Sequence, residues 1–133
     1  MKTIDQYNNI KKQYQNYVVL LKVGSFYITY YDDAYILNHL FSYQIKDKKV
    51  GFPIGIIEKI KSELKTKQIN LCLMEDDLIL IKYPNNEYQK YLYNAKMSYF
   101  SEQDINNLLE QITFLIKSDF NNFKKIKEFI NEF

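Results

Sequence analysis

The chain contains no arginine and no tryptophan, and it has one cysteine, two prolines and three glycines among 133 residues. A single cysteine, Cys72, excludes an intramolecular disulfide. Its place in the apolar run INLCLM predicts a buried, inert thiol and not a nucleophile. So little glycine and proline is not typical of a disordered or fibrous chain. The length suits one compact domain.

Long apolar runs are also missing. The longest, such as YVVLL and LILI, fall far short of the ~20 residues that cross a bilayer. The opening stretch MKTIDQYNNIKK has no apolar segment and carries Asp5, so we expect no secretory signal. The expected location is therefore the cytoplasm, with no membrane contact.

The basic side chains are all lysines, 18 of them, beside 13 tyrosines and 9 phenylalanines. These residues have A/T-rich codons, and an A/T-rich genome accounts for much of their abundance. We therefore do not interpret lysines among aromatic residues as a nucleic-acid signature. A net charge of +2 is also low for a dedicated DNA-binding protein, which neutralises roughly six to ten phosphates.

Hydrophobic periodicity predicts an α/β fold, a mixed β-sheet of five to six strands flanked by helices, with a C-terminal helical pair. Asp32 and Asp33 are expected to cap and charge a helix start, and Ser101 with Asp104 resembles a capping box. We expect an α/β domain over residues 1–93 and a helical extension over 94–133 that packs on it. The expected helices are 4–16, 32–41, 56–67, 101–117 and 121–132, and the expected strands are 17–23, 26–31, 43–46, 50–54, 69–74 and 78–83.

Motifs for catalysis or cofactor binding are missing from the sequence. His39 has no cysteine or second histidine three or four residues away, which argues against a metal site. No glycine-rich phosphate loop and no Ser-His-Asp order is present. The pair Asp32-Asp33 remains an alternative carboxylate site, although a helix start is the simpler interpretation. We expect neither an enzyme nor a cofactor.

The stretch KVGSFYITYYDDA places an aromatic residue, Phe26, directly after Gly24-Ser25. Strand-like runs flank it on both sides. Two interpretations are open. Phe26 fills a core, as phenylalanine commonly does, or it stands at a loop edge where its ring can enter a partner.

A series of short motifs runs in one order through the first 83 residues. They are Gln6-Tyr7, Gln13-Tyr14, the apolar run 17–23, GSFYI at 24–28, Asp32-Asp33-Ala34, FPIG at 52–55 and INLCLMED at 69–76. In this order they resemble the N-terminal, mismatch-recognition domain of the MutS family of DNA mismatch repair proteins. That domain has Q-Y motifs in its first helix, then an apolar strand, G-D-F-Y-E, and an acidic pair before alanine. The resemblance implies a MutS domain I-like fold over about 4–83, here as a free-standing domain without the family's ATPase.

The resemblance also implies a DNA-contact residue. In the family, the phenylalanine of F-x-E enters the duplex at a mispair as an unstacking wedge, which costs less where pairing is already faulty. Phe26 matches this residue by position. Ser25 stands at the preceding aspartate, and Ile28 stands at the glutamate, where it offers no hydrogen bond to a base. The DNA-contact residues expected on this basis are Phe26, Ser25, Lys22, Lys46, Lys48 and Lys49.

Two functions therefore stay open. The first is a DNA-binding module that contacts duplex or mismatched DNA in a repair context through Phe26 and nearby lysines. An ordinary solvated surface would carry the same lysines, so the lysines by themselves do not indicate DNA binding. The second is a protein-interaction module that has lost mismatch reading and binds a DNA repair or replication protein.

Overall fold

In a computed structural model, residues 2–133 are described and form two compact units, one ending at Met97 and the other comprising Ser98–Phe133. Of the described helices, none has the length and apolar character of a membrane-crossing segment. The expectation that an extension over 94–133 packs on the α/β domain stays a prediction.

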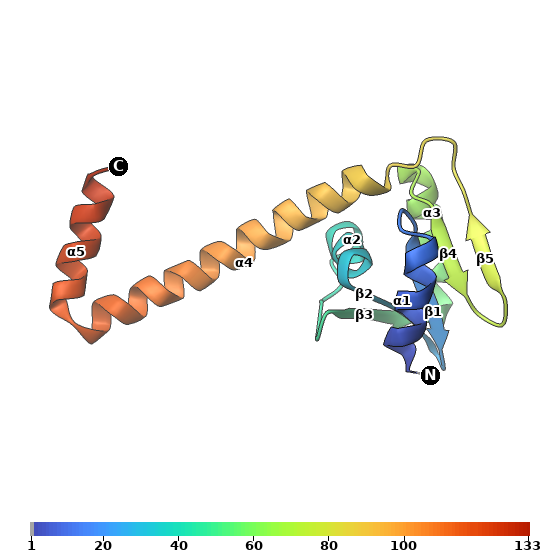
Figure 1. Cartoon of the computed structure of the whole chain (residues 1–133), viewed down its shortest axis with the longest axis horizontal. Helices are drawn as coiled ribbons and strands as arrows, with labels where there is room; N and C mark the ends of the chain where they lie inside the picture. Colours follow the sequence, from blue (N-terminus) through green and yellow to red (C-terminus); the bar gives the residue numbers. More distant parts are fainter. Residues whose placement is uncertain (1) are drawn as a thin grey trace. The chain divides into compact units, whose positions relative to one another are not determined.

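The first unit is built on a five-stranded mixed sheet with the order β3-β2-β1-β4-β5 (Figure 1). β1 runs parallel to β4, and the other neighbouring pairs are antiparallel. The predicted mixed sheet is thus confirmed, with five strands. Their bounds are Val18–Val23 for β1, Phe26–Tyr30 for β2, Lys49–Pro53 for β3, Leu71–Met74 for β4 and Leu78–Ile81 for β5.

Helices cover both faces of this sheet. The helix α1 packs on one face through Tyr7, against Leu21 and Cys72. The opposite face carries the larger core, to which Leu37 and Leu64 contribute. The bounds are Thr3–Gln13 for α1, Tyr31–Phe41 for α2, Ile54–Ile56 for the 3-10 turn η1, Ile57–Lys67 for α3, Tyr88–Ser118 for α4 and Phe120–Asn131 for α5.

The central strand β1 explains why two cores form. Val18 and Leu20 face the larger core, while Val19 and Leu21 face α1, and all four are buried. Alternate side chains of a strand point to opposite faces, so four consecutive apolar residues require cover on both sides of the sheet. Cys72, in the neighbouring strand, is buried as predicted, and burial raises the pKa of its thiol to about 11.

The predicted capping box at Ser101 is wrong. Ser101 lies inside α4, a continuous helix of 31 residues. Its first turns bury Tyr88, Leu92 and Ala95, whose spacing of four and three residues places them on one side of the helix. No glycine or proline interrupts the sequence from 88 to 118, so nothing stops the helix at Ser101.

The predicted strand at 43–46 is also wrong, apart from an isolated bridge between Lys46 and Lys49. Tyr43 instead stacks its ring on Phe41 and Phe52, with centroid distances of 5.6 and 5.8 Å. The segment 43–46 therefore contributes the Tyr43 ring to the core and forms no strand pairing beyond that single bridge.

Candidate functional site

The β1–β2 hairpin presents the residue that sequence analysis singled out. Val23 pairs with Phe26, so the loop consists of only Gly24 and Ser25. Gly24 has a φ of +60°, and glycine at the first central position with a positive φ is the pattern of a type II′ turn. The Ser25 carbonyl accepts a hydrogen bond of 3.0 Å from the Ile54 amide, which fixes the turn against η1.

Phe26 is a surface residue and not a core residue. Its side chain is 49% exposed, and that of Val23, its partner across the hairpin, is 39% exposed. The next residue, Tyr27, is buried, and its ring lies tilted against that of Phe52 at a centroid distance of 5.7 Å. Burying a phenylalanine is worth ~1.5–3 kcal/mol, so the hairpin forgoes part of this energy by leaving the ring in solvent.

Ile28 lies on the same sheet face as Phe26, two residues further along β2. It is half-buried and packs in the core beneath α1, opposite Leu21. At this position the structure therefore places an apolar side chain directed into the protein, and no group that can bind a base edge.

The predicted lysines do not gather around Phe26. Lys22 pairs with Tyr27, so its side chain leaves the sheet on the face opposite Phe26. Lys46, Lys48 and Lys49 lie at a turn at the other end of β3, where Lys49 pairs with Tyr30. Phe26 is four residues from Tyr30 along β2, about 13 Å at ~3.3 Å per residue. All four lysines are exposed.

An acidic turn occupies the end of the sheet where Phe26 lies. Glu75, Asp76 and Asp77 connect β4 to β5, and Leu21 of β1 pairs with both Ile28 and Met74, which fixes the direction of the strands. The Tyr27 hydroxyl donates a hydrogen bond to Glu75, so this turn reaches across β1 to β2. Burial and the Glu75 carboxylate raise the pKa of Tyr27 to about 12.

Asp33, expected from the sequence to cap and charge a helix start, is instead a buried carboxylate. It sits in the first turn of α2, but it is fully buried and does not act as the N-cap, a position held by Tyr30. Four groups donate to its carboxylate: Lys11 Nζ at 2.8 and 3.0 Å, Tyr7 Oη at 2.6 Å, Tyr88 Oη at 2.7 Å and the Val19 amide at 3.1 Å.

These contacts identify Asp33 as a structural anchor. A buried carboxylate is tolerated when a cation and hydrogen-bond donors compensate its lost hydration, and here both are present. Burial, and secondarily the Asp33 charge, raise the pKa values of Tyr7 and Tyr88, so both hydroxyls stay protonated and donate. The described residues contain no cluster of three metal-ligating side chains.

Comparison with protein-family models gives a match to MutS domain I over residues 2–76. This span covers more than half of the 133 residues. The chain belongs to the MutS domain I family. No curated protein matches it.

The match places Phe26, Ile28 and Asp33 inside the MutS domain I region, together with strands β1 to β4. The resemblance drawn from the Q-Y, G-S-F-Y and D-D-A motifs is thereby confirmed. β5 and Tyr88 follow the matched region, although β5 completes the sheet and Tyr88 completes the Asp33 anchor.

Proposed function

We propose that this MutS-type recognition domain contacts duplex DNA in DNA repair, with Phe26 entering the base stack from the tip of the β1–β2 hairpin. The observation that carries the proposal is the 49% exposure of Phe26, the residue that corresponds to the family's wedge by resemblance of the GSFYI motif. A ring held at a two-residue turn is presented with little conformational freedom, which lowers the entropy lost on insertion.

The surroundings of Phe26 limit how tightly DNA would bind. The acidic turn 75–77 lies at the same end of the sheet, while Lys46, Lys48 and Lys49 lie at the other. Few phosphates can then be neutralised beside the wedge, so affinity is expected in the micromolar range of non-specific contact. Because Ile28 supplies no hydrogen bond, we expect little discrimination among mismatches. A duplex that is already weakened, such as one with a single-base bulge, is the best substrate for a wedge that acts alone.

The test is a fluorescence-anisotropy titration of the full chain with matched, mismatched and single-base-bulge duplexes at two salt concentrations. Phe26→Ala should weaken binding to the bulged duplex most. Tyr93→Ala is the matched control, since it removes an aromatic ring that is 65% exposed on α4. Equal binding by wild type and Phe26→Ala to every duplex would refute the wedge.

A second candidate function is binding to a basic protein partner. The specific observation that favours it is that the acidic turn 75–77 lies at the same end of the sheet as two exposed apolar side chains, Phe26 and Val23. An apolar patch with an acidic rim suits a partner that offers an apolar pocket bordered by lysine or arginine. The same titration separates the two functions, because this candidate predicts no binding to any duplex even at low salt.

A further inference from the structure

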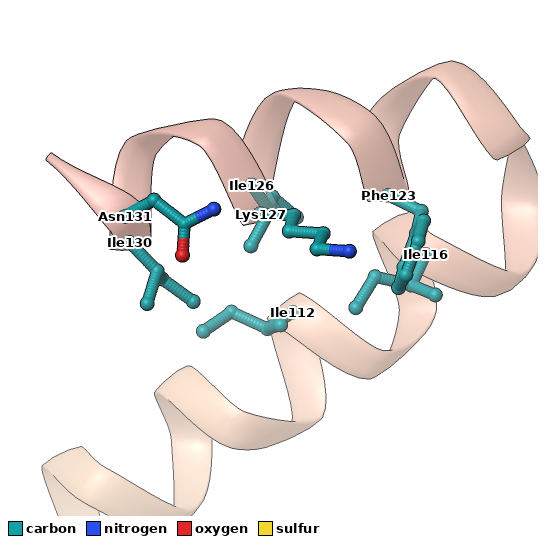
Figure 2. A pocket seen from close by; sticks show the side chains of 7 residues that line it. All are labelled: Ile112, Ile116, Phe123, Ile126, Lys127, Ile130 and Asn131. Atoms are coloured by element: carbon teal, nitrogen blue, oxygen red, sulfur yellow. The ribbon is translucent and has the colours of Figure 1, made fainter.

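The C-terminal unit is a helical hairpin whose two arms are incompletely packed. Asp119 caps α5 by accepting a hydrogen bond of 2.9 Å from the Asn121 amide, and α5 then returns along the end of α4. Between the arms lies a groove of about 210 Å³, lined chiefly by Ile112 and Ile116 of α4 and by Phe123, Ile126 and Ile130 of α5 (Figure 2). Packed protein interiors have few voids larger than a water molecule. Two helices alone therefore do not complete this core.

The hairpin also carries apolar side chains that neither of its helices covers. Six of them are between 44% and 61% exposed: Ile105, Leu108, Leu109, Leu115, Phe129 and Ile130. At roughly 100 Å² each they leave on the order of 600 Å² accessible, where a monomer rarely exposes more than a few hundred. This area approaches the ~800 Å² that each partner buries in a standard protein interface.

The charges of the two arms are opposite. From Ser98 to Ser118, α4 carries three carboxylates, Glu102, Asp104 and Glu110, against one lysine, Lys117. In the twelve residues of α5 the lysines are Lys124, Lys125 and Lys127, against one acid, Glu128. Across residues 98–133, all of them described, no carboxylate lies within ion-pair distance of a lysine. The complementary charges of the hairpin are thus unpaired within one chain.

We infer that residues 98–133 form a dimerisation hairpin, through which two copies of this chain associate as a four-helix bundle. A two-fold axis places α4 of each copy beside α5 of the other, so the acidic and basic arms meet twice. The same arrangement closes the apolar groove and covers the exposed leucines and isoleucines in the core of the bundle. We assign a second copy of the chain to this surface because it supplies both the apolar area and the charges opposite to those of each helix.

The first measurement is the mass of the full chain in solution, by sedimentation across a range of concentrations. The expected result is a species of twice the 16.1 kDa of one chain, dissociating on dilution. A monomer at every concentration, as results if the hairpin docks on its own α/β domain, overturns the inference.

Charge reversal gives the sharper test. One variant carries Glu102→Lys, Asp104→Lys and Glu110→Lys, and the other carries Lys124→Glu, Lys125→Glu and Lys127→Glu. Each alone places like charges against like in a homodimer and should raise the Kd by about 100-fold. Mixed together, the two variants regain opposite charges at both contacts and should form a heterodimer of near wild-type affinity. This recovery also shows that each variant is folded.

The matched control reverses three exposed lysines on the α/β domain, with Lys12→Glu, Lys59→Glu and Lys65→Glu. These changes should leave dimerisation unaltered. The inference is overturned if the control weakens association as much as the α5 variant does, or if mixing the two hairpin variants yields no heterodimer.

Discussion

The Tyr88 hydroxyl donates a hydrogen bond of 2.7 Å to the buried carboxylate of Asp33, a residue 55 positions earlier in the chain. Lys11 and Tyr7, both on α1, donate to the same carboxylate. One side chain of α2 therefore holds α1 and the start of α4 at the edge of the core. A donor lost from a buried charge leaves that charge under-compensated, and this costs more than the hydrogen bond alone.

Tyr88→Phe is therefore expected to lower the free energy of unfolding by about 1.5–3 kcal/mol, the range for hydrogen bonds to charged groups. The ring that lies 4.5 Å from Lys11 Nζ is kept, so the variant removes the hydroxyl alone. Urea denaturation of the full chain measures the change. Tyr93→Phe, on an exposed side chain of the same helix, is the control and should be neutral. An equal loss in both variants would show that the Asp33 contact contributes nothing specific.

Phe26→Ala is expected to cost far less stability than Phe52→Ala. The Phe26 ring is 49% exposed, whereas Phe52 is 1% exposed and belongs to the larger core. Truncating a buried phenylalanine costs about 3–5 kcal/mol, and the loss at Phe26 should be about 1–1.5 kcal/mol, because only about half of its area is buried. Thermal melts of the two variants beside wild type decide the matter. A loss at Phe26 as large as that at Phe52 would place its ring in the core and remove the wedge.

Gly24→Ala should destabilise the hairpin by about 1–2 kcal/mol, the cost of a left-handed conformation for a residue with a Cβ. No atom lies within 4 Å of a Cβ built at Gly24, so the expected loss comes from the backbone alone. Gly55→Ala is a close match, because its Cβ also meets open space and its φ is not positive. Chemical denaturation of both variants tests this, and equal effects would contradict a strained turn at Gly24.

Alkaline pH should lower the stability of the domain through Tyr27. The pKa of Tyr27 is raised from 10.0 to about 12, so the folded state holds its proton more tightly than the unfolded state. Stability linked to this group is complete below pH 10 and is lost as the pH rises toward 12. Tyr27→Phe should reduce the slope of stability against pH in this window, measured by urea midpoints at several pH values. An unchanged slope would mean that Tyr27 ionises as readily in the folded state as in the unfolded state.

Much of the α/β domain was predictable because its signals are local. The run 17–23 and the Gly24-Ser25 break predicted β1, its turn and the start of β2, and the structure confirms all three. The acidic turn after Met74 likewise predicted the β4–β5 hairpin. Apolar runs and turn residues carry this information within a few positions, so no knowledge of tertiary contacts is needed.

The features that the sequence did not predict depend on contacts between residues far apart in the chain. Asp33 looked like a helix cap, because nothing near it in sequence shows that α1 and α4 deliver donors to its carboxylate. The lysines at 46–49 looked close to Phe26 until the antiparallel register of β2 and β3 placed them at the other end of the sheet. Ser101 looked like a helix start because its local pattern is that of a cap, although the preceding residues already form a helix. In each case strand pairing or packing determines the position and role of the residue, and the local sequence pattern does not.

The family match ends at residue 76, but the sheet does not. β5 forms the outer edge beside β4, and Tyr88 supplies a donor to the core from beyond that strand. The segment that matches the family model is therefore shorter than the unit that folds. A fragment cut at the family boundary would expose β4 as a new edge strand, prone to pairing with other chains, and would leave Asp33 with one donor fewer. A version of the domain transferred to another protein should include the residues up to Ala95, where the packed core ends.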